Sequence, residues 1–272
     1  MSDRGEIAVP LLLECVEVRG RARGGNSKPL LVQAIASDDQ RHDVVLKVRK
    51  PDGTGHFEGT SLACELIAAM LGQYLGLSVP PYAIVNVSPA LVRAIRDRKD
   101  AALLGENLGL NFGSVFINRC STWTPRPSVK ESLRMQLESV LCFDSSIING
   151  DRTSIKPNLI YNGEQLYIID HALAIPVHQW SDEEIDQSPL FPDGYIRNHC
   201  SFMSLLKKQI TFENFFHQWR TKVDSNVLVQ IRKHIPKSWE QHPGHLDSIF
   251  KFLQGRDART EEQRVEIVRV TS

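Results

Sequence analysis

The stretch "SIINGDRTSIKPNLIYNGEQLYIIDHALAI", residues 146–175, combines a predicted hairpin with three polar side chains placed around it. Its Asn-Gly pair, residues 162–163, separates two apolar runs, which is typical of a two-residue hairpin turn. Asp151 lies in the loop that enters the hairpin, Asn158 begins its first strand, and Asp170 ends its second. Because a hairpin brings its two ends together, we expect Asn158 and Asp170 to be neighbours, with Asp151 over the same site.

These three side chains carry the oxygen ligands that Mg²⁺ prefers. An aspartate and an asparagine that converge from two loops can hold Mg²⁺, which keeps several waters and takes its other oxygens from phosphates. A further carboxylate can accept a proton from a substrate hydroxyl or orient that hydroxyl. The pattern predicts phosphoryl transfer, with Asn158 and Asp170 as metal ligands and Asp151 as the catalytic residue. Turn formation is the alternative explanation for each residue taken singly.

The sequence upstream offers a lysine for the phosphates. Lys47 lies in a predicted strand, residues 41–50, on the face opposite to Val44. Glu65 follows on a predicted helix, residues 60–77, which has one apolar face. Kinase-like folds place a strand lysine and a helix glutamate in this order, so we predict that Lys47 binds phosphate and that Glu65 is its partner. Solvent-facing positions on the strand and the helix are the alternative.

A glycine-containing loop separates the first two predicted strands. It reads "RGRARGGN", residues 19–26, and the backbone amides of Gly24 and Gly25 can approach a phosphate. The loop lacks the GxGxxG spacing, so a plain hairpin turn is the alternative. Gly24 and Gly25 are candidate phosphate contacts, and the plain hairpin turn is the favoured explanation of the loop.

The composition excludes several classes of protein. The 272 residues are 42% hydrophobic and carry no formal net charge, unlike a strongly basic nucleic-acid binder. No window is apolar enough for a membrane helix, and the N-terminus does not resemble a secretion signal. The five cysteines are scattered without zinc spacing, which is typical of reduced thiols. We therefore expect a cytoplasmic protein that binds neither nucleic acid nor membrane directly.

The order of predicted elements indicates a two-lobed α+β chain. The first hundred or so residues read mainly as strands, and the rest mainly as helices, clearest over 128–148, with the hairpin among them. We expect an N-terminal lobe over residues 1–118 and a C-terminal lobe over 119–272. Further amphipathic segments are predicted at 200–209, 211–221, 225–234 and 245–254. The charged tail after them is expected to fray or to dock through its last apolar residues.

Residues 143–175 resemble the HipA-like kinases, in the shorter branch whose motif reads roughly FDxLxxNxDRTxxNPNLL, followed by a small hairpin and LIDHG. Three upstream segments are similar to other motifs of that branch: "VVLKVR" at 44–49, "ELIAAMLGQYLGLSVPPYAIVNVSPAL" at 65–91, and "LNFGS" at 110–114, near the hinge. The resemblance covers residues 10–175, and the last hundred residues match only loosely.

This resemblance implies a bilobal protein-kinase-like fold, ATP and Mg²⁺ as cofactors, and phosphorylation of Ser or Thr on a protein. Related branches are toxins that phosphorylate translation components, so an antitoxin or a neighbouring regulatory protein is a candidate partner. By motif, Asp151 resembles the catalytic aspartate, Asn158 and Asp170 the metal ligands, Lys47 the phosphate lysine and Glu65 its partner.

The sequence departs from the family motif at two positions. Lys156 stands where the family has the first Asn of NPN, so one candidate metal ligand is missing. We expect Asn158 to serve instead, because it opens the strand aimed at the other end of the hairpin. Ala172 follows His171 where the family has Gly, so the loop is expected to differ locally.

Four further motif residues have a structural explanation beside the functional one. Arg152 is expected either to neutralise a phosphate or to fix the loop of Asp151. His171 is expected to be a structural hydrogen-bonding residue. Asn111 and Ser114 are candidate nucleotide contacts near the hinge, with the capping of a turn as their alternative.

Three functions are consistent with these residues. The first is an active protein kinase. The second is a pseudokinase that binds nucleotide without transferring phosphate, which Lys156 and the weak glycine loop favour. The third is a lipid or small-molecule kinase, although no basic amphipathic membrane segment supports it.

Overall fold

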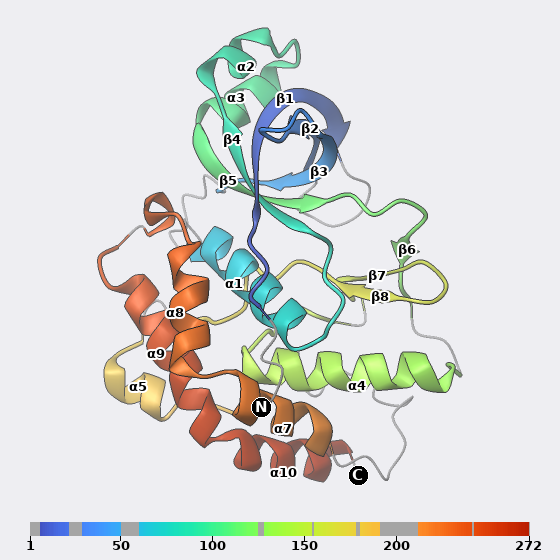
Figure 1. Ribbon diagram of the computed structural model, residues 1–272, viewed down its shortest axis with the longest axis vertical. Helices are drawn as coiled ribbons and strands as arrows, with labels where there is room; N and C mark the ends of the chain where they lie inside the picture. The colour runs from blue at the N-terminus through green and yellow to red at the C-terminus, as the bar shows by residue number, and fades with distance from the viewer. Residues whose placement is uncertain are drawn as a thin grey trace.

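A closed β-barrel lies at one end of the molecule, and most of the helices lie at the other (Figure 1). The predicted glycine loop with Gly24 and Gly25, and the predicted helix over 200–209, fall outside the described residues. The computed structural model describes residues 6–21, 29–49, 60–124, 128–153, 155–177, 180–190, 212–240 and 242–271.

Five strands form the barrel, in the order β1-β2-β3-β5-β4. β1 and β4 pair in parallel, and the other neighbours pair antiparallel. The strands are β1 (Leu11–Arg21), β2 (Leu30–Ile35), β3 (Arg41–Lys47), β4 (Tyr82–Val87) and β5 (Gly109–Val115).

The alternation of side chains along β3 decides where Lys47 points. Val44 and Leu46 are buried in the core of the barrel, together with residues of β1, β2 and β4. Because successive side chains of a strand face opposite sides, Lys47 lies on the outer face, at the position paired with Phe112 of β5. The predicted orientation of Lys47 is confirmed.

Helix α1 (Thr60–Tyr74) is buried on nearly all sides, from Leu62 to Leu71. The predicted apolar face is buried, and burial extends beyond it because α1 packs on β5 and on helices of the C-terminal half at the same time. Its apolar residues belong to the same core as those helices and not to the barrel core. The division of the chain at residue 118 stays a prediction.

Between β4 and β5 the chain forms two short helices, α2 (Pro89–Ala94) and α3 (Arg98–Gly105). Ser88 caps α2 by accepting a hydrogen bond from the backbone of Leu91, as the Ser-Pro pair predicts. No sequence pattern predicted α3. Asp97 begins it, and its carboxylate accepts backbone hydrogen bonds in the first turn.

The C-terminal half is mainly helical. The longest helix among its described residues is α4 (Glu131–Ser146), and a small sheet joins β6 (Ser121–Thr122) to the predicted hairpin of β7 (Leu159–Tyr161) and β8 (Leu166–Ile168). The charged tail forms the helix α10 (Thr260–Thr271), which docks on the rest of the protein because its Ile267 is fully buried. The remaining helical elements are α5 (Asp182–Asp186), α7 (Glu213–Lys222), α8 (Ser225–Lys233), η2 (Lys237–Trp239) and α9 (His245–Ala258).

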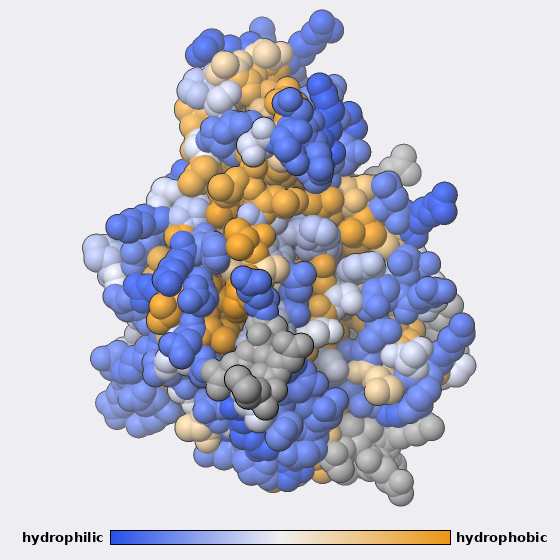
Figure 2. All heavy atoms as spheres, in the orientation of Figure 1, coloured by the Kyte–Doolittle hydropathy of each residue, from blue (hydrophilic) through white to orange (hydrophobic). Residues whose placement is uncertain are grey.

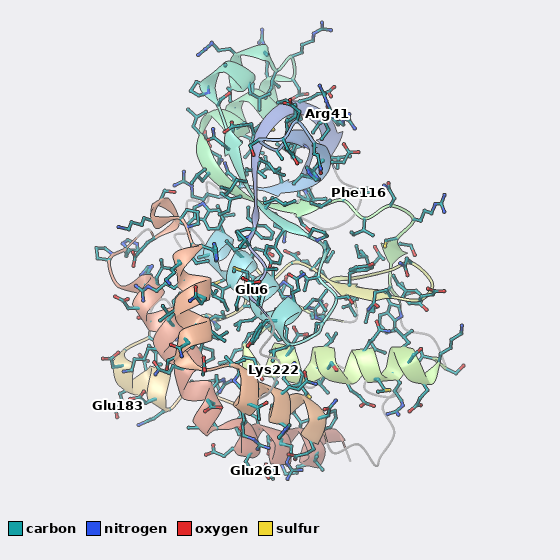
Figure 3. All side chains as sticks on the ribbon, viewed as in Figure 1. Glu6, Arg41, Phe116, Glu183, Lys222 and Glu261 are labelled. Carbon is teal, nitrogen blue, oxygen red and sulfur yellow. The ribbon has the colours of Figure 1, made fainter. Side chains whose placement is uncertain are left out.

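On the face shown in Figure 2, apolar surface gathers where the barrel meets the helices, whereas the helical end is mostly hydrophilic. Charged side chains such as Glu183 on α5 and Glu261 on α10 point outward there (Figure 3). Among the described residues, no helix is both long and apolar enough to cross a membrane.

Candidate active site

The loop after α4 is held by the buried guanidinium of Arg152. Its Nε donates to Oδ2 of Asp144 at 2.5 Å, and its Nη2 donates to Oδ1 of the same carboxylate at 3.2 Å. Its Nη1 donates to the carbonyl oxygens of Pro157, at 3.2 Å, and Asn158. Arg152 therefore ties the end of α4 to the start of the hairpin, and of its two explanations these contacts favour the structural one.

The hairpin brings the two predicted ends together. Leu159 of β7 pairs with Ile168 of β8, and the backbone N–H of Ile169 donates to the carbonyl of Asn158 at 3.1 Å. Asn158 and Asp170 both adopt left-handed backbone conformations, with φ of 47° and 63°. Asn and Asp enter this region several times more often than other non-glycine residues, which suits both positions to these residue types.

Lys47 is the point at which three parts of the chain meet. Its ammonium lies 2.7 Å from Oδ1 of Asp170 and forms an ion pair with Oε1 of Glu65 on α1. The other oxygen of Glu65 accepts the backbone N–H of His171 at 3.0 Å. Glu65 is only 2% exposed, so it is a buried partner of the lysine and not a solvent-facing helix residue. A strand of the barrel, α1 and the end of the hairpin are thus joined through one ammonium group.

Lys156 is a member of the site that sequence analysis treated only as a missing ligand. Its ammonium lies 2.5 Å from Oδ2 of Asp151 and 3.0 Å from Oδ2 of Asp170. It therefore bridges the predicted catalytic carboxylate and a predicted metal ligand. The sequence feature that could have predicted this role is the position of Lys156 in the short loop between Asp151 and the hairpin. A long side chain there can reach both Asp151 and the end of the hairpin.

Asn158 turns its amide nitrogen toward Asp151. The Nδ2 group donates to Oδ2 of Asp151 at 3.2 Å and to the backbone carbonyl of the same residue at 3.3 Å. Its contact with the second strand is made by the backbone. The shared ion between Asn158 and Asp170 stays a prediction, as do the roles of the other site residues.

The two lysines set the charge of Asp170. Burial alone would raise the pKa of this carboxyl, but the ammonium groups of Lys47 and Lys156 outweigh burial and hold the pKa well below its usual range. Burial likewise opposes the charged form of Lys47, yet Glu65 and Asp170 raise its pKa above the ordinary value. Asp170 and both lysines are therefore charged at neutral pH.

The donor set suits a divalent ion only if a phosphorylated ligand completes it. Among the described residues, no group of three or more His, Cys, Asp or Glu side chains is arranged to hold a metal. The carboxylates of Asp151 and Asp170 are hard oxygen ligands, and Mg²⁺ in nucleotide sites commonly takes one or two carboxylates plus phosphate oxygens and waters. These residues fit Mg²⁺ brought in with a nucleotide better than a metal bound alone.

Asn111 has a structural role in the barrel. Its amide nitrogen donates to the carbonyl oxygens of Asn107, at 2.8 Å, and Gly109, at 3.0 Å. The residue is 1% exposed, and these bonds cap the turn that leads into β5. They favour turn capping as the role of Asn111, and its contact with nucleotide stays a prediction.

His171 is buried and neutral. Its Nε2 lies 3.3 Å from Nη2 of Arg152 and accepts a hydrogen bond from that guanidinium. Burial, followed by the charge of Arg152, lowers the pKa of His171 from 6.5 to about 3. Between these two pH values the unfolded chain binds a proton that the folded chain does not, so the free energy of unfolding decreases as the pH falls.

We expect His171 to make the protein less stable in mild acid. It should remove ~2 kcal/mol from the free energy of unfolding between pH 7 and pH 5. Urea unfolding at the two pH values, for the wild type and for His171→Gln, measures this contribution. The variant keeps an acceptor for Arg152 but does not titrate, so its stability should depend less on pH. If the free energy of unfolding depended on pH equally in the wild type and in His171→Gln, the conclusion that His171 is buried and neutral would be contradicted.

Comparisons with known proteins identify the family and show a similar fold. The sequence model of the family described as HipA-like kinase matches residues 15–260. The solved structure of the Helicobacter pylori proinflammatory kinase CtkA has 10% sequence identity and a TM-score of 0.57, and the match covers 95% of this chain and 98% of that one. At this identity the likeness shows the fold alone. No curated protein matches the chain.

Two structures of a Golgi casein kinase are also similar, one of them with Mn/ADP bound. Each has 14% identity and covers 97% of this chain and 74% of that one, with TM-scores of 0.46 and 0.44.

Proposed function

Because this chain belongs to the HipA-like kinase family, we propose that it transfers the γ-phosphoryl group of ATP, with Mg²⁺, to a Ser or Thr hydroxyl of a protein. The observation that carries the proposal is the meeting of Lys47, Glu65 and Asp170. Protein kinases need both a strand lysine paired with a helix glutamate and a metal-binding aspartate in place for phosphoryl transfer. The meeting of these three side chains supports the proposal.

Each side chain has a separate task in this proposal. Lys47 binds the phosphates, and Glu65 fixes the position of Lys47. Asp170 and Asn158 hold Mg²⁺, which when bound neutralises charge on the phosphates. The Asp151 carboxylate accepts a hydrogen bond from the substrate hydroxyl. It takes up the proton as the hydroxyl oxygen bonds to the γ-phosphorus and the bond to the β-phosphate oxygen breaks.

We further propose a bilobal arrangement, with residues 1–118 as the N-terminal lobe and 119–272 as the C-terminal lobe. The nucleotide then lies between them, and the amides of Gly24 and Gly25 cover its phosphates. The substrate is a protein, an antitoxin or a neighbouring regulatory protein is a candidate partner, and the cytoplasm is the proposed compartment.

One contact favours a second candidate function, a pseudokinase. Lys156 spans Asp151 and Asp170 and lies where the family has an Asn. In a pseudokinase this ammonium would keep Asp151 from a substrate hydroxyl, and the protein would respond to nucleotide without transferring phosphate.

Incubation with γ-labelled ATP and Mg²⁺ separates the two functions. We expect label to appear on the protein itself or on a lysate protein, as phosphoserine or phosphothreonine, and to disappear with a chelator. Lys47→Met should lower the rate by about 10²-fold or more, since one buried charge contact to the phosphates is lost. Lys233→Met, an exposed site on α8, is the matched control and should change nothing. A higher melting temperature with ATP but no label transfer would support the pseudokinase.

A further inference from the structure

The ammonium of Lys156 lies where a cation is needed between two carboxylates. It is 2.5 Å from Asp151 and 3.0 Å from Asp170, which are both 19% exposed. With Lys47 on the other oxygen of Asp170, that carboxylate has an ammonium group on each side. Lys156 is thus part of the charge balance of the site, although 34% of its side chain is exposed.

The backbone holds Lys156 in this position. Its N–H donates to the hydroxyl of Thr153 at 3.0 Å, and its carbonyl accepts the N–H of Thr153 at 2.9 Å. The next residue, Pro157, has a fixed φ, and its carbonyl accepts a bond from the buried Arg152. These backbone contacts and the fixed φ of the proline therefore orient the side chain of Lys156 toward the carboxylates of Asp151 and Asp170.

An ammonium group can supply charge to this site but cannot ligate a metal. A lysine ammonium has three donors and no lone pair. Protein kinases use two Mg²⁺ ions, one held by the aspartate that corresponds to Asp170 and one by an asparagine of the catalytic loop. In this chain Lys156 stands in place of that asparagine, and its ammonium puts a positive charge beside the carboxylates of Asp151 and Asp170.

We propose that Lys156 takes the place of one of the two divalent ions, so that this kinase binds its nucleotide with a single metal. The inference rests on the proposed kinase function. Asp170, together with Asn158, holds the one ion, and the ammonium of Lys156 contacts a phosphate oxygen and offsets the negative charge next to Asp151. No bond is made or broken by Lys156, which acts as a positioning and charge-compensating residue.

The number of divalent ions bound with nucleotide tests this proposal. Mn²⁺ replaces Mg²⁺, and free Mn²⁺ is followed by electron paramagnetic resonance at a saturating concentration of a non-hydrolysable ATP analogue. We expect one Mn²⁺ per chain for the wild type. Lys156→Asn returns an amide oxygen to this position and should raise the number to two. Lys233→Asn makes the same change on the exposed face of α8 and should leave it at one.

A second variant tests the charge alone. Lys156→Met removes the ammonium without adding a ligand, so at saturating Mn²⁺ the affinity for the analogue should fall by about 10-fold, as expected when one charge-assisted contact is lost. Unchanged affinity, or tighter binding, would overturn the proposal and indicate that Lys156 obstructs the site.

The outcomes also separate this inference from the proposed function. Two Mn²⁺ ions bound by the wild type would overturn the single-metal inference, and so would equal numbers bound by the wild type and Lys156→Asn. Neither result would contradict the proposed kinase function. Nucleotide bound without any Mn²⁺ would overturn the inference as well. A wild-type protein that binds no ATP analogue at all would overturn both.

Discussion

Asp151→Asn and Asp170→Asn are each expected to lower the rate of phosphoryl transfer by about 10³-fold, but only Asp170→Asn should weaken nucleotide binding. Asp151 faces the substrate hydroxyl in the proposed mechanism, so its loss affects the chemical step. Asp170 lies between Lys47 and Lys156 and is the proposed metal ligand. Its loss removes the charge that binds Mg²⁺ with the phosphates.

Asparagine is the most informative replacement at both positions, because it removes the charge and changes little else. At Asp170 the backbone has φ of 63°, a conformation that Asn tolerates and Ala does not, so the loop keeps its shape while the charge is removed. At Asp151 the amide oxygen of Asn can still accept the hydrogen bond from Nδ2 of Asn158. A loss of activity can then be assigned to the carboxylate charge and not to a displaced loop.

Two measurements are needed. Single-turnover transfer from γ-labelled ATP gives the rate, and calorimetric titration with ADP and Mg²⁺ gives the affinity. Asp247→Asn, on the exposed part of α9, makes the same chemical change outside the site and is the control. Transfer at the wild-type rate in Asp151→Asn would remove that residue from the mechanism, and undiminished binding of Mg²⁺ and ADP by Asp170→Asn would refute its role as the metal ligand.

Local sequence patterns predicted much of the site. The Asn-Gly pair predicted the hairpin and the closeness of its two ends. It did not predict the register, because Tyr161 pairs with Leu166 and Asn162 bonds to Gln165, so the turn is centred on Gly163 and Glu164. Alternation along β3 predicted the face of Lys47, since apolar residues on one side must face the barrel core. These features depend on neighbours in the chain, and a single sequence contains that information.

Contacts between distant segments could not be predicted in the same way. Helix α1 is buried on nearly all sides because α8 and η2, far along the chain, cover it in addition to β5. The ion pair of Lys156 with Asp151 and Asp170 depends on the path of the loop and on the reach of a flexible side chain. Residue type suggested a lost ligand at this position, and only the three-dimensional arrangement shows an added cation.

The largest effect on stability is expected at Arg152. This guanidinium is 1% exposed, and its partner Asp144 is fully buried. Arg152→Met leaves the carboxylate of Asp144 in the interior without its cation, although Asn149 still donates to Oδ1 at 2.8 Å. The carbonyl oxygens of Pro157 and Asn158 also lose their donor. We expect the free energy of unfolding to fall by about 3–5 kcal/mol, the cost of breaking a buried ion pair from one side.

Chemical denaturation of three variants separates the buried charge from the lost packing. Arg232→Met breaks an exposed ion pair with Asp247 and should cost less than ~1 kcal/mol. Adding Asp144→Asn to Arg152→Met removes the buried negative charge, so the double variant should be more stable than Arg152→Met alone. If Arg152→Met cost no more than Arg232→Met, the guanidinium would not be what holds the loop of Asp151. If the double variant recovered no stability, the lost carbonyl contacts, and not the buried charge, would account for the effect.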